Sequence, residues 1–336
     1  MGTVVHWQQL SPILSIFRLM PEDGSPFPGY KAGQYIALRR DDCRLTKRTI
    51  GEDGKPRYVP DLDEERNRKV GPVTHSYSIS SAPFETERNR WLEFYVVLEE
   101  GQSGEPGRLT ESLFRIHPGE DDKVGYVDRI AGDFTLDKRA DGARNVVMVG
   151  TGTGLAPFAG MAKQLDHDAS QGRRDDKRYT LFHANRSRAE LAYHEDLLAI
   201  EAAGRFDFVY VPSVSRPTAQ DRQEPRLGTG RGNNVLRYVF GMPLKEEEEA
   251  RRAEGGPDAA RMAEAVEKAV RPSLPRHLSP TSLQDRAFPA DTVIHLREPL
   301  LDGGHQVHRR VEQDPLREGG LEAGPAREDL SPPPRT

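Results

Sequence analysis

Three glycines at alternate positions, Gly150, Gly152 and Gly154, follow an apolar β-branched run in the segment 145–158 (NVVMVGTGTGLAPF). Glycine lets a backbone bend tightly and come close to a ligand. The residues after the turn predict an amphipathic helix, whose first N–H groups and positive dipole end suit a pyrophosphate. Pro157 fixes φ inside the first helical turn, where a missing N–H costs nothing. The spacing is not the G-x-G-x-x-G fingerprint, so glycines needed only for packing would give the same pattern.

A second candidate site is the strand-like segment 75–83 (HSYSISSAP), in which an aromatic ring is flanked by hydroxyl groups. Such a strand can present the ring of Tyr77 and the hydroxyl of Ser78 to a flat, polar heterocycle. An ordinary strand with surface serines has the same local pattern. The segments 94–97 (FYVV) and 107–110 (GRLT) follow in order, and this context favours the ligand-binding interpretation.

These motifs together resemble the ferredoxin–NADP reductase family. The family has an Arg-x-Tyr-Ser strand, an aromatic-Tyr-Val-Val strand, a Gly-x-Leu-Thr turn and a Gly-Thr-Gly-Thr-Gly-x-Ala-Pro-Phe turn. This chain has all four counterparts in the same order, and the likeness covers residues 1–40, 75–240 and 290–296. The departure is His75, which stands where the family has the arginine that meets the flavin pyrophosphate. A neutral histidine carries no full charge at pH 7, so FAD binding would depend on other contacts.

The resemblance implies two cofactors, FAD and NADP(H), and a role for each matching residue. Tyr77 would pack on the isoalloxazine ring and Ser78 would hydrogen-bond near its N5 atom, which makes these two the expected catalytic residues. The other implied flavin contacts are His75, Ile79, Ser80, Tyr95, Val97, Gly107, Leu109 and Thr110. The implied dinucleotide contacts are Gly150, Thr151, Gly152, Thr153, Gly154 and Pro157. FAD supplies the redox chemistry, while the protein supplies position and electrostatics.

Arginines that follow the next two strands predict NADPH rather than NADH. In an open α/β sheet, the carboxyl ends of the strands line the crevice where ligands bind. Planar guanidinium groups bind phosphate oxygens bidentately. The candidate ligands of a 2′-phosphate are Arg186, Arg188, Arg216 and Arg231, with Ser215 and Tyr193 as hydrogen-bond donors. Arg186 and Arg188 equally fit a solvated loop, whereas Arg216 also matches the family pattern.

The elements that must position these residues fall into two groups. Residues 1–140 hold short strand-like runs between glycines and prolines, which predicts an antiparallel β-barrel that binds FAD. Within this part, 41–74 reads as a surface excursion and 131–136 as a short strand. From 143 to 296 strands alternate with helices, which predicts an α/β doubly wound parallel sheet that binds NADP(H). A charged helical insertion is expected at 243–290.

Composition narrows the remaining functions. The length of 336 residues fits about two domains. A formal net charge of -5 gives no reason to expect nucleic-acid binding. The single cysteine, Cys43, excludes a disulfide framework and a Cys-rich zinc or iron–sulfur site, and no metal site is predicted. The first residues lack the layout of a signal peptide, and their apolar runs are too short to span a bilayer. We therefore expect a cytoplasmic monomer without a nucleic-acid or membrane partner.

The segment 297–336 loses every apolar period and has no aromatic residue, so we expect an irregular, disordered tail. The family resemblance implies a Cys-Gly-Asn-Pro turn, a Met-led helix and a terminal aromatic residue after Leu296. Possible codons from Arg297 onward, when they are read one base later, permit the sequence CGNPSSMADIKFIAELNRIRFEKEDW, in which Leu321 followed by Glu322 allows the final Trp codon. We hypothesise that the residues after Leu296 are translated out of frame; a naturally divergent tail is the alternative.

The sequence thus predicts an FAD-dependent reductase that moves hydride between NADP(H) and flavin. The resemblance implies that single electrons pass to or from ferredoxin or flavodoxin. Because the chain has no cysteine cluster for an iron–sulfur centre of its own, the acceptor would be a separate protein or small molecule. Two alternatives remain open. One is an oxygenase-type or free-flavin NAD(P)H reductase, and the other is a flavin-binding module inactivated by its altered C-terminus.

Overall fold

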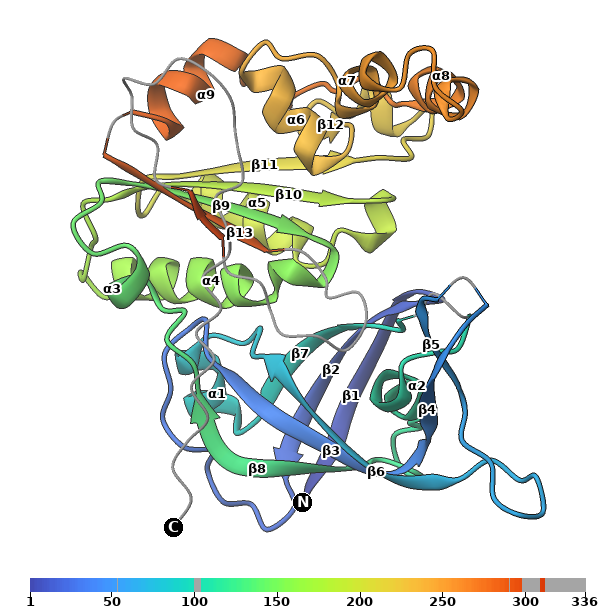
Figure 1. Cartoon of the computed structure of the whole chain (residues 1–336). Helices are drawn as coiled ribbons and strands as arrows, with labels where there is room; N and C mark the ends of the chain where they lie inside the picture. Colours follow the sequence, from blue (N-terminus) through green and yellow to red (C-terminus); the bar gives the residue numbers. More distant parts are fainter. Residues whose placement is uncertain (53, 100–103, 290, 298–308, 312–336) are drawn as a thin grey trace.

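The computed structural model of the chain describes residues 1–52, 54–99, 104–289, 291–297 and 309–311. Most of its strands belong to two large sheets that lie one above the other (Figure 1). Helix α4 (Ala156–Ser170) lies between the two sheets and covers the near face of the upper one. The arrangement therefore has the two-part architecture that the sequence predicts.

The first sheet is antiparallel and six-stranded, with the order β6-β3-β8-β1-β2-β7. Its strands are β1 (Gly2–Ser11), β2 (Leu14–Pro21), β3 (Tyr35–Arg44), β6 (Val70–Ser78), β7 (Leu92–Val97) and β8 (Lys123–Ala131). Its two edge strands approach each other where the Ser80 N–H donates to the Glu93 carbonyl at 2.8 Å. The sheet thus curls around a core that includes Phe17 and Phe94. The predicted antiparallel barrel is confirmed.

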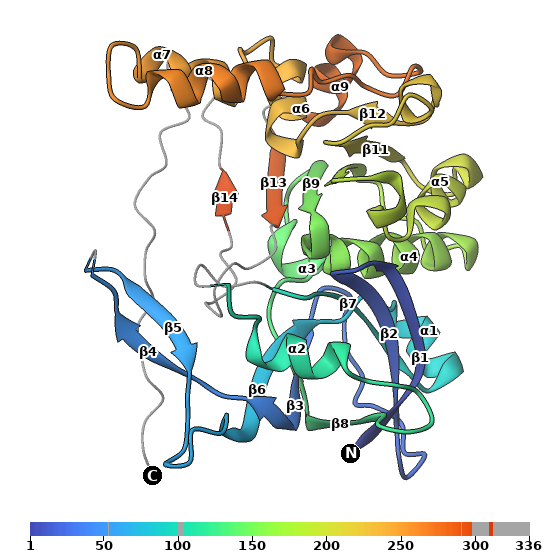
Figure 2. The ribbon, with the colours of Figure 1, turned by 90° about the vertical axis from the view of Figure 1, so that its right-hand side faces the viewer.

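Two features of this part depart from the sequence expectations. The excursion 41–74 contains a two-stranded hairpin, β4 (Thr46–Ile50) and β5 (Pro56–Pro60), which projects from the barrel (Figure 2). The residues 131–136 do not form a separate strand, because β8 ends at Ala131 and Gly132 has φ +103°. Three short helices complete this part: α1 (Pro83–Asn89), α2 (Arg108–Phe114) and α3 (Leu136–Arg139).

The second sheet has the order β12-β11-β10-β9-β13-β14. Its strands are β9 (Asn145–Thr151), β10 (Arg178–Asn185), β11 (Phe208–Val214), β12 (Gly228–Thr229), β13 (Thr292–Arg297) and β14 (Arg309–Val311). Neighbours from β12 to β13 are parallel. Helices α4 and α5 (His194–Ala203) cover one face, and α6 (Gly232–Val239) and α9 (Pro280–Ala287) cover the other. This confirms the doubly wound parallel sheet.

The predicted insertion 243–290 has two kinds of helix. Helices α7 (Lys245–Arg252) and α8 (Ala259–Lys268) lie at the edge of the molecule, and α8 has no buried residue (Figure 2). Helix α9 instead buries Leu283 and Ala287 in the cluster that covers the parallel sheet. Helix α8 is therefore a surface decoration, α7 is held to α6 by the hydrogen bond from Asn234 Nδ2 to Glu246 Oε2 at 2.7 Å, and α9 is part of the fold.

Three residues of the expected irregular tail, Arg309–Val311, form β14, which pairs antiparallel with β13. The residues 298–308 and 312–336, and with them almost all of the segment that the frame hypothesis concerns, lie outside the described residues. Among the helices that the structure describes, none combines the length and the apolar character that crossing a membrane requires.

An apolar cluster joins the two sheets. Leu14, Ile16 and Tyr95 of the antiparallel sheet pack in one cluster with Met148 of β9 and Phe158 of α4. Because burial of apolar surface is the main favourable term in such contacts, the two parts hold a defined relative position. This position brings the motif-bearing strands of both parts together.

Candidate functional site

The strand β6 carries the first motif, and β3 is its neighbour in the sheet. Tyr77 lies opposite Ile36 in the antiparallel register, and Ser78 lies opposite Tyr35. The ring of Tyr77 is half-buried and packs against the core of the curled sheet. Burial, and then the charge of Glu99, raise the pKa of Tyr77, so its phenol stays protonated at neutral pH. Tyr77 and Ser78 are both half-buried, as the predicted contact with a flavin ring requires.

The next two residues close the edge of the sheet. Ile79 and Ser80 are fully buried. The Ile79 N–H donates to the Gln34 carbonyl at 3.0 Å, and the Ser80 N–H donates to the Glu93 carbonyl. Their amides are therefore engaged within the protein, and the expected contact of these two residues with a cofactor remains a prediction.

Strand β7 presents Tyr95 to the second sheet. The Tyr95 hydroxyl donates to the Glu190 carbonyl at 3.0 Å and accepts from Asn185 Nδ2 at 3.0 Å. Val97 packs against the same cluster, while Phe94 and Val96 lie in the core of the curled sheet. Side chains alternate between the two faces of a strand, so Tyr95 and Val97 share the face toward the parallel sheet. Their expected contact with the flavin tail remains a prediction.

The turn 107–110 begins helix α2, which packs on β3 and β6 (Figure 2). Leu109 and Thr110 are buried, and Thr110 Oγ1 donates to the Gly107 carbonyl at 3.1 Å. A Cβ at Gly107 would lie 2.6 Å from Thr110 Oγ1, so only glycine fits this turn. The turn thus lets a ligand come close to the backbone beside β6. This fits a phosphate-bearing cofactor such as FAD.

One residue of this turn, Arg108, was not singled out by the motifs. Arg108 is half-buried, and His75 on β6 is half-buried as well. Burial, and then the positive charge of Arg108, lower the pKa of His75, so the imidazole is neutral at pH 7. The signal for Arg108 was present in the sequence, because it occupies the variable position of the Gly-x-Leu-Thr motif.

The glycine turn joins β9 to α4. Thr151 ends β9, and a 3₁₀ turn, η1 (Gly152–Leu155), leads into the helix, in which Pro157 lies in the first turn. Gly152 has φ +50°. A Cβ at Gly150 would lie 3.0 Å from Leu155 Cα, so the tight return of the chain requires glycine there. Gly154 is buried, whereas Thr151, Gly152 and Thr153 are half-buried at the carboxyl end of the sheet. The turn has the form that a dinucleotide pyrophosphate needs.

The carboxyl ends of β10 and β11 bring Arg216 beside Arg186. The Arg216 N–H donates to the Arg186 carbonyl at 2.8 Å, and the Ser215 N–H donates to the Asn185 carbonyl at 2.9 Å. The Arg216 side chain is exposed and forms no ion pair within the described part of the chain. The first residue of α6, Gly232, lies close to the end of β9, because a Cβ at Gly232 would lie 3.1 Å from Thr151 Cγ2. The glycine turn and Arg216 therefore border one edge of the sheet.

The other predicted cations have partners. Arg186 forms a bidentate pair with the buried Glu190, with Nε 2.9 Å from Oε2. Arg188 lies 3.4 Å from Glu195 and 3.5 Å from Glu224, and Arg231 lies 3.7 Å from Glu246. Arg216 is thus the predicted cation that these acids leave free.

Tyr193 does not join the arginines. Its hydroxyl donates to Ser80 Oγ at 2.9 Å, and Lys163 Nζ lies 5.0 Å from its ring centroid. Lys163 also pairs with Glu85 at 2.7 Å. Tyr193 therefore links the parallel-sheet part to the end of β6, and its expected role as a phosphate donor remains a prediction.

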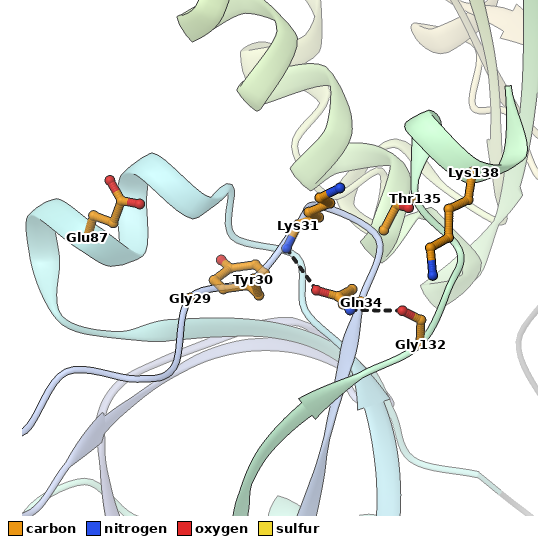
Figure 3. Close-up of a pocket in the computed structure, with 8 residues that line it drawn as sticks. All are labelled: Gly29, Tyr30, Lys31, Gln34, Glu87, Gly132, Thr135 and Lys138. Carbon is orange, nitrogen blue, oxygen red and sulfur yellow. Dashed lines mark hydrogen bonds between the residues drawn. The ribbon is translucent and has the colours of Figure 1, made fainter. Parts of the chain in front are cut away.

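A cavity of about 540 Å³ lies away from these motifs, beside the loop that precedes β3 (Figure 3). Within it the Lys31 N–H donates to Gln34 Oε1 at 2.9 Å, and Gln34 Nε2 donates to the Gly132 carbonyl at 2.8 Å. None of the predicted site residues is among those that line it: Gly29, Tyr30, Lys31, Gln34, Glu87, Gly132, Thr135 and Lys138. The sequence contained no signal for it.

Comparison with known proteins supports this assignment of the two parts. Residues 148–248 match the family described as oxidoreductase NAD-binding domain. The flavohemoprotein of Bordetella pertussis (strain Tohama I) is 29% identical over 200 residues, which cover 59% of this chain and 40% of that protein. The flavohemoprotein of Chromobacterium violaceum is 30% identical over 156 residues, 45% of this chain and 30% of that protein. The chain thus spans two fifths or less of the length of these two relatives.

Two solved structures are similar to the chain over about two thirds or more of its length. A ferredoxin NADP+ reductase from Neisseria gonorrhoeae with bound FAD and NADP is 17% identical, with a TM-score of 0.44 over 79% of this chain and 89% of that one. The flavohem-like FAD/NAD binding domain of nitric oxide dioxygenase from Vibrio cholerae O1 biovar El Tor is 22% identical, with a TM-score of 0.45 over 66% and 76%.

The fold and the site define a class, the oxidoreductases that bind FAD and NAD(P) in two adjoining parts of one chain. The family match over residues 148–248, the curated relatives and the ordered motifs make this chain similar to the FAD/NAD(P)-binding ferredoxin reductase-like proteins.

Proposed function

We propose that the chain is an FAD-dependent NADPH reductase that delivers electrons to a separate acceptor, ferredoxin or flavodoxin. FAD, held along 75–78 and 107–110, would supply the chemistry that links two-electron hydride transfer to one-electron steps. The protein's own contribution is to bind both dinucleotides and to set their relative position.

The observation that carries this proposal is the contact between the two motif-bearing parts. The 3₁₀ turn η1 packs against β7, and a Cβ at Gly160 of α4 would lie 3.0 Å from the Ser81 carbonyl. The Tyr193–Ser80 hydrogen bond fixes the same junction. A dinucleotide at the glycine turn and a flavin along β6 would therefore meet across this junction, where proximity and orientation lower the barrier to transfer.

The coenzyme preference is argued from charge. Arg216 is the exposed cation at the strand ends that the neighbouring acids do not neutralise, and an additional phosphate on the ribose would bind it. Glu190 does not hold a ribose hydroxyl in this arrangement, because Arg186 occupies both of its carboxylate oxygens. These contacts support NADPH over NADH.

The acceptor has two candidates. The resemblance implies ferredoxin or flavodoxin, whereas the curated relatives are named flavohemoproteins, which favours a haem protein as the second candidate. In a competition assay with NADPH as the electron donor, we expect the chain to reduce ferredoxin or flavodoxin in preference to small quinones or free flavins. Preferential reduction of a globin-type haem protein, or of the small acceptors, would contradict the first candidate.

A further inference from the structure

Arg108 and His75 form a pair that the motifs do not explain. Arg108 is the first residue of α2, directly after the Gly107 turn, and α2 packs on the strand that carries His75. Both side chains are half-buried, and the charge of Arg108 reaches the imidazole. A cation placed beside another basic group costs free energy unless an anion is bound there.

The acids around this pair do not neutralise Arg108 in the part of the chain that the structure describes. Glu105 pairs with Arg68, and Glu111 pairs with Arg44 and Arg115. Glu99 lies beside the turn, where a Cβ at Gly107 would lie 3.3 Å from its Oε2; its charge acts on Tyr77, and no ion pair between it and Arg108 is found among the described residues. Among the described residues, Arg108 therefore has no ion-pair partner, although it is half-buried and adjoins the tight turn at Gly107.

We propose that Arg108 binds the pyrophosphate of FAD and so replaces the arginine that the family has at the position of His75. The inference rests on the proposed FAD binding along 75–78 and 107–110. The positive charge has moved from the strand to the adjoining helix, while the phosphate position that it serves stays the same. His75 then contributes a hydrogen bond without a charge, and Arg108 is a binding residue for the phosphate end of the flavin.

The test compares two ligands that differ in this end of the molecule. Apo-protein is titrated with FAD and with riboflavin, which carries the same ring without the pyrophosphate, and flavin fluorescence gives each Kd. We expect Arg108→Gln to weaken FAD binding by about ten- to hundredfold, the effect of losing one charge-assisted hydrogen bond. Riboflavin binding should change by less than about twofold, because the ring does not contact Arg108.

Two further variants separate a phosphate contact from a general loss of structure. Arg129→Gln removes an exposed cation from β8 of the same sheet and should leave both Kd values unchanged. His75→Arg combined with Arg108→Gln restores the strand arginine and should recover most of the FAD affinity. Thermal melting without flavin confirms that each variant is folded.

The outcomes distinguish this inference from the proposed function. If the unchanged protein binds FAD and Arg108→Gln binds it equally well, the inference is overturned and the proposed function stands. Equal losses for FAD and riboflavin would also overturn it, because they would show a structural role. If the unchanged protein fails to bind FAD, the proposed function falls and the inference falls with it.

Discussion

At the residue scale, the arginines at the strand ends divide into paired and unpaired side chains. Arg186, Arg188 and Arg231 all have carboxylates nearby, and Arg186 is held by a buried one. A paired guanidinium binds an added phosphate weakly, because the existing carboxylate competes for the same donors. We therefore expect selection for the 2′-phosphate to depend mainly on Arg216.

This division predicts the effect of Arg216→Gln. The value of kcat/KM for NADPH should fall by about ten- to hundredfold, since one charge-assisted phosphate contact is lost. The value for NADH should change by less than about threefold, because NADH has no phosphate at that position. Steady-state reduction of ferricyanide with both coenzymes measures this ratio.

The exposed Arg222 offers a matched control, since Arg222→Gln removes a neighbouring surface charge and should leave the ratio unchanged. If Arg216→Gln lowers kcat/KM equally for NADPH and NADH, Arg216 does not recognise the 2′-phosphate.

The motifs predicted the elements that carry the candidate residues better than the partners of their side chains. Tyr77 lies on a strand and the three glycines lie in a turn between a strand and a helix, because short-range turn and strand chemistry determines both. Tyr95 and Tyr193 instead bridge the two parts through Glu190, Asn185 and Ser80. Those partners are distant in sequence, and the alternation of a strand gives two faces without saying which one meets the other sheet.

At the element scale, β10, β11 and α5 bury a small polar cluster. Tyr210 Oη lies 2.9 Å from His183 Nδ1 and 3.2 Å from His194 Nδ1. All three side chains are buried, and the Nε2 atoms of both histidines lack a hydrogen-bond partner among the described residues. Burial, and then the neighbouring His194, lower the pKa of His183 from 6.5 to about 3. Burial also lowers the pKa of His194.

The cluster predicts acid sensitivity of the fold. The folded pKa of His183 is below its unfolded value, so its contribution to stability is present above pH 6.5 and is lost as the pH falls toward 3. The free energy of unfolding should therefore decrease by up to about 1.4 kcal/mol per pH unit for this group in that window. Urea unfolding between pH 7.5 and 5.5, at about half-unit steps, measures the slope.

In His183→Gln, the free energy of unfolding should depend less steeply on pH, by the equivalent of about one proton taken up on unfolding. This difference in slope is expected whatever the stability of the variant at pH 7.5. The exposed His6 gives the control, because His6→Gln should leave the slope unchanged. An unaltered slope in His183→Gln would show that His183 takes up no proton on unfolding.

Elements with strong local signals were predicted best. The β9 run, the α4 pattern and the helix at α6 follow from apolar period and glycine punctuation. The hairpin β4–β5 and the end of β8 at Gly132 were missed, because exposed, charged strands lack the apolar alternation that marks a buried one.

At the scale of the whole molecule, the parallel sheet ends in β13, which is where the family motifs stop. The frame hypothesis for the residues after Leu296 remains a prediction, because most of them lie outside the described structure. It predicts that the protein isolated from its own cells differs in intact mass from 37.6 kDa. A measured mass of 37.6 kDa, or resequencing that returns the same frame, would contradict it.

The central claim is that one chain brings NADPH and FAD together for hydride transfer. It is tested most directly by anaerobic titration of the FAD-loaded protein with NADPH, read from the visible flavin absorbance at equilibrium, so that a slow transfer still counts. We predict that the flavin absorbance bleaches, and that it does so at lower concentrations of NADPH than of NADH. A protein that binds FAD and keeps its full absorbance under excess NADPH would contradict the account, and would identify the chain as a flavin-binding module without reductase activity.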